Sequence, residues 1–321
     1  MAINVAGLKL DPPVFLAPLA GITDLPFRNL VSRFGAGLVV SEMVASQEMV
    51  QAKPSTRDRA ELGFEAANTS VQLAGREAHW MAEAARMVAA SGAQVIDINM
   101  GCPAKKVTSG YSGAGLLKDL DHALTLIDAV VSAVDIPVTL KTRLGWDDDL
   151  ITAPTLAKRA EAAGIQLLVI HGRTRCQFYK GQADWAAIAE VVEAVNIPVL
   201  ANGDIVDTQT ARAALTASGA VGVMVGRGAQ GRPWRLAQIA ANLNGAPEPL
   251  APSGPDLVDL VHGHYDAMLR FYGEDLGLRN ARKHLGWYMD TAGTEMALRK
   301  RVLTCRAPKE VMQLTKEALW T

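Results

Sequence analysis

The first three quarters of the chain alternate short, unbroken apolar runs with longer Ala-rich amphipathic segments. Apolar runs that lack polar alternation are typical of parallel strands buried on both faces. The segments between them, for example His79–Ala90 and Thr155–Ala163, predict helices. The eight predicted strands are Val14–Leu19, Leu38–Val40, Ser70–Leu73, Val95–Met100, Pro137–Leu140, Leu167–Ile170, Pro198–Ala201 and Val221–Val225.

The spacing of these runs indicates the fold class. Eight units over about 230 residues give about 30 residues per unit, the length of one strand and its helix. Two junctions repeat, DIPVTLK and NIPVLAN, in which Pro137 and Pro198 open strands where a missing amide is tolerated. No GxGxxG motif opens an early helix, as a doubly wound dinucleotide-binding sheet would require. The sequence therefore predicts an α/β fold, a closed (β/α)8 TIM barrel.

A second, smaller domain is predicted at the carboxyl end. Residues 243–256, LNGAPEPLAPSGPD, contain four prolines and read as a linker. We therefore expect a barrel domain over residues 1–243 and a small helical domain over residues 256–321. Asp256 and Thr294 are the expected N-caps. The four expected helices are Leu257–Arg270, Arg279–Asp290, Thr294–Cys305 and Pro308–Trp320.

Composition and charge limit the class of protein. The 321 residues are 49% hydrophobic with a formal net charge of -1, which excludes a uniformly basic nucleic-acid surface. Cys102, Cys176 and Cys305 are too few for a disulfide framework, so a reducing compartment is expected. The amino terminus lacks a signal-peptide pattern, and no apolar run approaches the roughly 20 residues of a bilayer span. We expect a cytoplasmic protein without membrane contact, and the histidine spacing predicts no metal site.

Polar residues gather where the predicted strands end, which is where barrel enzymes carry their chemistry. Glycines in Asn202-Gly203-Asp204 and Gly226-Arg227-Gly228 let backbone amides approach an anion, at the usual phosphate position of this barrel type. The same glycines could merely turn tight corners. Lys141 and Arg143 end the fifth strand, and a buried lysine without an anion is costly. An anionic cofactor or substrate is the preferred interpretation.

Cys102 lies in a loop at a strand end, between Gly101 and Pro103. A thiol with a pKa of about 8.5 is mostly protonated at neutral pH and could donate a proton. It could instead be a nucleophile if Lys105 or His171 lowered its pKa, or a small buried apolar side chain. His171 alone could be only a local hydrogen-bonding group.

The carboxyl-terminal region is locally basic. Between Leu276 and Lys309 there are eight basic and two acidic residues, a local formal charge of +6. Such a run can be a solvated helix face, or it can bind a phosphate backbone while Tyr272, Trp287 and Tyr288 stack on bases. The pattern alone leaves both readings open.

Several motifs together resemble one family, the tRNA-dihydrouridine synthases. The resemblance runs from about Phe15 to Tyr288, and NMGCPAKKV is its most specific part, whereas APLAG and ANGD also occur in other flavin-binding barrels. The tail RNARKHLGWY is most similar to the B-type bacterial subfamily. The matching motifs are APLAGITDLPFR, SEMV, VQLAG, DINMGCPAKKV, VTLKTRLGW, IHGRTR, VLANGDI and MVGRGAQGRPW.

This resemblance implies an FMN-dependent reductase that saturates the C5–C6 bond of particular uridines in tRNA, with NADPH as electron donor. It implies that Cys102 is the general acid and that Asn99 and Arg143 contact the uracil. Arg282 and Lys283 are predicted to contact tRNA, and no obligate protein partner is implied, so a monomer is expected. The implied FMN contacts are Pro18, Leu19, Ala20, Gln72, Lys141, His171, Asn202, Gly203, Asp204, Gly226 and Arg227.

Two other functions remain open at this point. An FMN barrel could reduce a free pyrimidine such as dihydroorotate or another small molecule, which would not need the basic helical tail. A non-catalytic RNA-binding module on a barrel scaffold would need the tail but not the set Cys102, Lys141 and His171.

Overall fold

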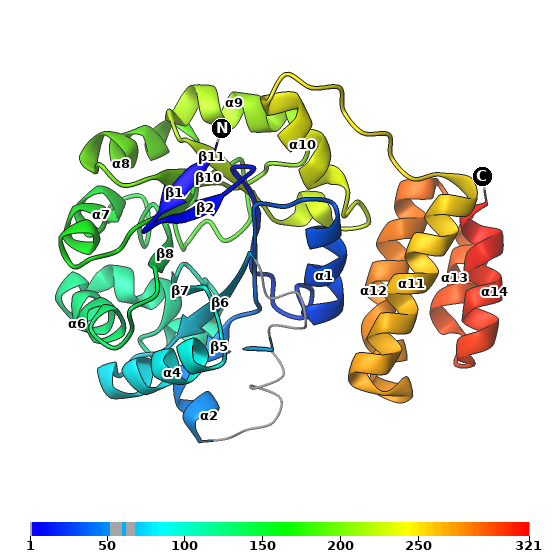
Figure 1. Ribbon diagram of the computed structural model, residues 1–321, viewed down its shortest axis with the longest axis horizontal. Helices are drawn as coiled ribbons and strands as arrows, with labels where there is room; N and C mark the ends of the chain where they lie inside the picture. Colours follow the sequence, from blue (N-terminus) through cyan, green and yellow to red (C-terminus); the bar gives the residue numbers. More distant parts are fainter. Residues whose placement is uncertain (1, 52–59, 62–67, 321) are drawn as a thin grey trace.

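A computed structural model describes residues 2–51, 60–61 and 68–320 of the chain. Within them, eight parallel strands follow one another around a barrel, which a pairing between β4 and β6 closes (Figure 1). This confirms the predicted TIM barrel. The strands are β3 (Val14–Leu16), β4 (Leu38–Val40), β6 (Thr69–Ala74), β7 (Val95–Met100), β8 (Val138–Arg143), β9 (Leu168–His171), β10 (Val199–Asn202) and β11 (Gly222–Val225).

Most strand boundaries agree with the predicted ranges to within one residue, and two differ by three residues. β3 ends at Leu16, three residues early, and β8 runs on to Arg143. The polar end of β8 is buried inside the barrel, so an apolar run underestimates its length. A short strand, β5 (Val44–Ala45), pairs with the second half of β6, after β4 has paired with its first half.

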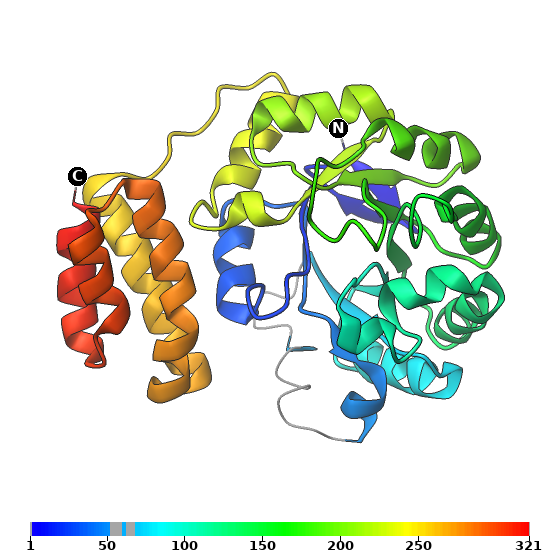
Figure 2. The ribbon, with the colours of Figure 1, turned by 180° about the vertical axis from the view of Figure 1, so that it is seen from behind.

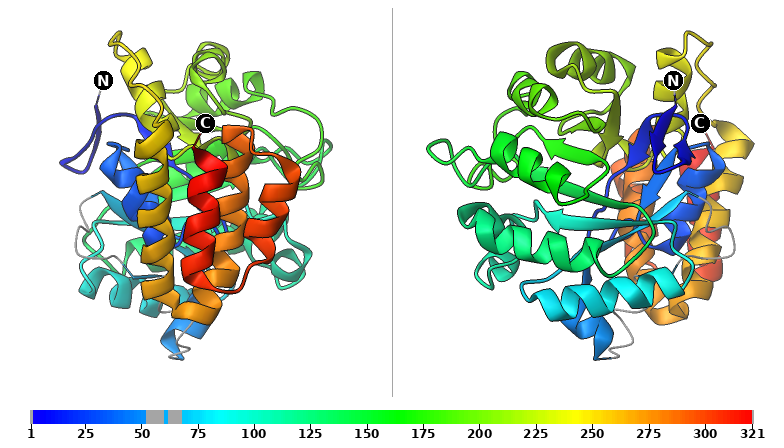
Figure 3. Two further views of the ribbon diagram at one scale, coloured as in Figure 1. Left: turned by 90° about the vertical axis from the view of Figure 1, so that its right-hand side faces the viewer. Right: turned by 60° about the vertical axis from the view of Figure 1, so that its left-hand side comes forward.

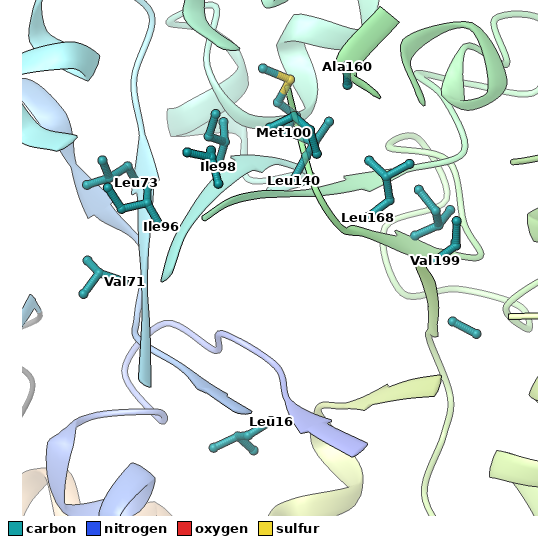
Figure 4. Close-up of a cluster of buried hydrophobic side chains, with 14 of the residues drawn as sticks. Leu16, Val71, Leu73, Ile96, Ile98, Met100, Leu140, Ala160, Leu168 and Val199 are labelled. Carbon is teal, nitrogen blue, oxygen red and sulfur yellow. The ribbon is translucent and has the colours of Figure 1, made fainter. Parts of the chain in front are cut away.

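Helices surround the barrel and cover its outer face (Figure 2). Strand side chains that point outward, such as Leu16, Ile98 and Leu140, form the main apolar core with them (Figure 4). The helices in the described part of this domain are α1 (Leu25–Arg33), α2 (Ser46–Val50), α4 (Ala78–Ala90), α5 (Lys105–Thr108), α6 (Leu120–Val131), α7 (Ala153–Ala162), α8 (Ala189–Ala194), α9 (Thr208–Ser218) and α10 (Arg235–Leu243).

The barrel interior has an apolar end and a polar end. Inward-facing residues such as Phe15, Val95 and Met224 cluster with the hairpin formed by β1 (Ile3–Val5) and β2 (Leu8–Leu10). Because alternate strand residues share a face, the inward positions nearer the carboxyl ends hold polar side chains instead. The hairpin therefore seals one end, and the opposite end is left for chemistry.

After the linker, four helices form a separate bundle beside the barrel (Figure 3). They are α11 (Gly254–Tyr272), α12 (Glu274–Ala292), α13 (Met296–Thr304) and α14 (Pro308–Leu319). The bundle has its own apolar core, which Trp234 of the barrel domain joins. α12 begins five residues before the predicted Arg279, because Gly273 alone, at φ +76°, reverses the chain between α11 and α12.

Both predicted N-caps are wrong. Asp256 lies in the first turn of α11, which starts earlier because Pro255 fits a first turn, where a missing amide costs nothing. Glu295 caps α13 by accepting a hydrogen bond from the Leu298 amide. The Thr294 hydroxyl donates instead to the Ala318 carbonyl, at 2.6 Å.

The two domains meet through α1 and the loop after β11. Phe27 of α1 packs against the rings of His264 and His284, with centroids 5.7 and 5.1 Å apart. At Gly231, where φ is +68°, an added Cβ would lie 2.4 Å from the Trp287 carbonyl oxygen. Among the described residues, no helix is both long and apolar enough to cross a bilayer.

We predict that Gly231→Ala lowers the free energy of unfolding by about 3 kcal/mol, because it adds a clash between domains to the strain of a positive φ. Gly245→Ala is the matched control, since Gly245 has φ +70° and open space around it. The control is expected to cost about 1–2 kcal/mol. Thermal and denaturant melts measure both, and equal losses would contradict the close contact.

Candidate functional site

A cavity of about 420 Å³ opens at the carboxyl ends of the strands. The fourteen barrel residues that the sequence singled out all line it, while Arg282 and Lys283 of α12 do not. These lining residues are Pro18, Leu19, Ala20, Gln72, Asn99, Cys102, Lys141, Arg143, His171, Asn202, Gly203, Asp204, Gly226 and Arg227.

A buried hydrogen-bond network supports one side of the cavity. The Asp97 carboxylate accepts from the Thr139 hydroxyl and from Gln72 Nε2, both at 2.6 Å. The Gln72 carbonyl accepts from Asn99 Nδ2 at 2.7 Å, and Asn99 Oδ1 accepts from the Cys102 amide at 2.9 Å. The position of the Cys102 loop therefore depends on a chain of side chains inside the barrel.

Asp97 is a site residue that the sequence analysis missed. Burial raises its pKa, against the hydrogen bonds from Thr139 and Gln72, which lower it. The available signal was the run VIDINM, in which Asp97 and Asn99 are two residues apart and so share a face. An apolar strand with two polar residues on one face places those residues inside the barrel.

Lys141 lies buried in the wall of the cavity. Its ammonium donates to Asn202 Oδ1 at 2.8 Å, and Asn202 Nδ2 donates to the Met224 carbonyl. Burial and, to a smaller extent, the nearby Arg143 lower the pKa of Lys141 to about 8, although Asp97 acts to raise it. An ammonium has three N–H groups, and within the described part of the chain only one has an acceptor. The site therefore suits an electron-rich ligand.

The Arg143 guanidinium donates hydrogen bonds to backbone carbonyl groups. Its Nε donates to the Gly101 carbonyl at 2.8 Å, and Nη1 donates to the carbonyls of Thr174 and Phe178, both at 3.0 Å. Burial lowers its pKa to about 10, so it stays charged at neutral pH. Arg143 therefore ties the Cys102 loop to the loop after β9.

Two arginines and one carboxylate organise the far end of the cavity. Asp204 accepts from Arg173 through both oxygens, from Arg227 at 3.0 Å and from the Ala183 amide at 2.9 Å. Burial alone would raise its pKa, but these hydrogen bonds and charges lower it. A carboxylate this well paired orients Arg227 and is not itself a ligand for an anion. Arg173, which was not predicted, lies two residues after His171 in the motif IHGRTR.

Two glycines line the cavity beside this pair. An added Cβ at Gly226 would be in ordinary van der Waals contact with Ala17 and Leu19, both at 3.7 Å. At Gly203, where φ is +111°, a Cβ would lie 2.8 Å from the His171 ring. The amides of Arg227 and Gly228 begin a 3-10 turn and have no acceptor within that turn. This arrangement of glycines, amides and Arg227 fits a phosphate group.

His171 is held neutral beside the cavity. Burial lowers its pKa well below the usual value, and the charges of Lys141, Arg143, Arg173 and Arg227 lower it further. Its Nε2 lies 3.4 Å from Arg173 Nη1, and because an arginine only donates, Nε2 is the accepting nitrogen. The ring proton is therefore on Nδ1.

The Cys102 thiol is free and partly exposed. Its amide is held by Asn99, and its carbonyl accepts from the Ala114 amide at 3.0 Å. Gly113, at φ +55°, leaves no space for a side chain there, since a Cβ would lie 3.0 Å from the Cβ of Cys102. The Cys102 backbone is thus fixed, and Cys102 lines a cavity that it shares with Lys141. Cys176 is exposed, and Cys305 packs in the helical domain.

The two predicted tRNA contacts on α12 have different surroundings. Lys283 Nζ lies 3.4 Å from the position of a Cβ at Gly21, between the cavity residues Ala20 and Ile22. Arg282 has a buried Nε without a hydrogen bond among the described residues, and its charge acts on the buried Tyr265 of the bundle. Lys283 therefore lies beside the loop after β3 that carries cavity residues, and Arg282 faces the bundle.

Comparison with known proteins gives consistent matches over nearly the whole chain. The dihydrouridine synthase family matches residues 15–321. A probable tRNA-dihydrouridine synthase of Rhodobacter capsulatus is 63% identical over 99% of this chain and 98% of its own length. A tRNA-dihydrouridine synthase B of Xanthomonas campestris is 46% identical over 98% of this chain and 95% of its own length.

Solved structures show a similar fold at low sequence identity. Morphinone reductase matches with a TM-score of 0.55 at 14% identity, over 78% of this chain and 92% of its own. Histamine dehydrogenase from Rhizobium sp. 4-9 matches with a TM-score of 0.58 at 13% identity, over 83% and 50%. These two likenesses support the barrel alone. The family match and the identity to its members show that this chain belongs to the dihydrouridine synthase family of oxidoreductases.

Proposed function

We propose that this protein binds FMN in the barrel cavity and reduces the C5–C6 bond of particular uridines in tRNA, with NADPH as electron donor. The observation that carries this proposal is the combination, in one cavity, of a thiol on a fixed backbone, a buried ammonium and a glycine-lined phosphate position. Membership of the dihydrouridine synthase family supports the choice of reaction. The barrel over residues 1–243 would hold FMN, and the helical domain over residues 256–321 would bind tRNA.

The residues present fit FMN from one end to the other. Arg227 and the amides near Gly203 and Gly226 suit the phosphate. The spare N–H groups of Lys141 suit the hydrogen-bond acceptors of the flavin ring, and Gln72 and neutral His171 line the same cavity. The apolar wall is Pro18, Leu19 and Ala20. The volume lies within the range of about 300–1,000 Å³ for cofactor sites.

The protein's own groups account for the rest of the reaction. When bound, reduced FMN would supply the hydride that adds to C6 of the uracil. Negative charge then develops on O4 and C5 of the base, and the Lys141 ammonium and the remaining N–H of Asn99 can stabilise it. The Cys102 thiol gives its proton to C5, which completes the addition of two hydrogens across the bond.

A uridine inside folded RNA cannot reach this cavity without leaving its stack. Extruding the base costs a few kcal/mol, which contacts elsewhere on the tRNA must offset. Lys283 beside the loop after β3 and the basic residues of the bundle are the proposed source of those contacts. A reductase for free small molecules would not need them.

We predict that Cys102→Ala retains FMN but loses about 10²–10⁴-fold in turnover, because the proton donor to C5 is missing. Cys176→Ala is the matched control, since that thiol is exposed and outside the cavity. Flavin absorbance and the rate of dihydrouridine formation in a tRNA transcript measure both. Turnover of the Cys102 variant close to that of the control would refute the acid role.

We further predict that Lys283→Glu weakens tRNA binding and reduces the slope of log affinity against log salt by about 1, because one phosphate contact is lost. Flavin absorbance should not change. Arg282→Glu is the comparison variant: its buried Nε favours a loss of bundle stability over a change in salt slope. If Lys283→Glu leaves both affinity and slope unchanged, this side of α12 is only a solvated face.

A further inference from the structure

The loop between β3 and α1 forms part of the cavity wall and is tightly folded. Leu19 and Ala20 line the cavity. The Thr23 hydroxyl accepts from the Leu19 amide at 2.9 Å, and the Thr23 amide donates to the Leu19 carbonyl at 3.0 Å. The conformation of the wall therefore depends on Thr23 and on the residues that position Thr23.

Asp24 and Arg28 hold this loop from the side of α1. Asp24 Oδ1 accepts from the Phe27 amide at 3.0 Å and caps the helix. Arg28 Nη1 donates to the Thr23 carbonyl at 2.8 Å. Both side chains are buried, at 4% and 1% exposure, so solvent cannot replace a lost partner.

The helical domain supplies the other donor to Asp24. The hydroxyl of Tyr272, the last residue of α11, donates to Asp24 Oδ2 at 3.0 Å across the domain interface. Burial raises the pKa of Tyr272, so the hydroxyl stays protonated and remains a donor. α1 lies between the barrel and the bundle in Figure 1, which places this bond where the two domains meet. Tyr272 of α11 thus holds Asp24, the neighbour in sequence of Thr23, whose hydrogen bonds to Leu19 shape the cavity wall.

We propose that Tyr272 is a positioning residue for the cofactor: through Asp24 it holds residues 18–23 in the conformation that receives FMN. The helical domain then takes part in cofactor binding as well as in tRNA binding. This inference rests on the proposed function, because FMN is the ligand assigned to that wall.

The titratable and charged groups that face Asp24 make its hydrogen bond with Tyr272 dependent on pH. They are Tyr272 on α11, Tyr288 on α12, Arg28 on α1 and Glu42 after β4. The pKa of Asp24 is raised to about 6, mainly by burial and also by Glu42, against the Phe27 amide, the Tyr272 hydroxyl and Arg28, which lower it.

The sign of the effect follows from this raised pKa. The pKa of Asp24 in the folded protein is about 6, above the value of about 4 expected in the unfolded chain. Asp24 therefore contributes to folding stability below about pH 4, and this contribution is lost as the pH rises through about 6. The Tyr272 hydroxyl limits the loss because it stabilises the ionised carboxylate. Removal of the Tyr272 hydroxyl therefore destabilises this loop more above pH 6 than below it.

The test is FMN affinity, measured by quenching of flavin fluorescence when the FMN-free protein is titrated with FMN at about pH 5 and about pH 8. Tyr272→Phe is expected to bind FMN about tenfold more weakly than wild type at the higher pH, with a smaller loss at the lower pH. Tyr265→Phe is the matched control, because Tyr265 lies on the same helix and its buried hydroxyl has no hydrogen bond among the described residues. The control should stay within about twofold of wild type.

Asp24→Asn keeps an acceptor at this position but cannot ionise, so its FMN affinity relative to wild type should differ between the two pH values. Equal affinities of Tyr272→Phe and Tyr265→Phe at both pH values would overturn the proposal. If Tyr272→Phe does not fold, Asp24→Asn decides, and a wild-type pH dependence in that variant would overturn it. Failure of wild type to bind FMN at either pH would instead refute the proposed function.

Discussion

The site depends on a carboxylate inside the barrel, Asp97, whose burial requires that both of its oxygens be hydrogen-bonded. Thr139 and Gln72 supply those bonds. Gln72 is thereby fixed, its carbonyl fixes Asn99, and Asn99 fixes the amide of Cys102. Leaving a buried polar group without its hydrogen-bond partner costs about 1–3 kcal/mol, so this network has little freedom to rearrange. The Cys102 backbone is held by the barrel interior and not by the loop alone.

The two domains are separate along the chain but are in contact beside the cavity. The barrel provides the residues that line it, among them the buried Lys141 and Cys102. The bundle contacts the loop after β3, through Lys283 beside Gly21 and through Tyr272 on Asp24. In the proposed function, the bundle that binds the tRNA is therefore in contact with the loop that forms one wall of the cavity.

Sequence pattern predicts the barrel and most of the cavity because parallel strands bring their carboxyl ends together, so Lys141, Asn202 and Gly226 meet by topology alone. It does not predict partners that depend on side-chain direction. Asp97 lies within an apolar run, so the apolar pattern does not mark it as a site residue. The role of Arg173 is evident only from the structure, where it donates hydrogen bonds to Asp204. Arg282 and Lys283 are adjacent in sequence but about 100° apart around a helix, so they face different surroundings. The two N-cap predictions were wrong for different reasons. Pro255 lets α11 begin before Asp256, and Glu295 caps α13 in place of Thr294.

The central claim is that this cavity reduces uridine within tRNA. The most direct measurement incubates the purified protein with FMN, NADPH and an unmodified tRNA transcript, and maps the product by mass spectrometry. The account predicts that particular uridines gain two hydrogen atoms while free uridine stays unchanged. Reduction of a free pyrimidine with the transcript left unmodified would contradict it.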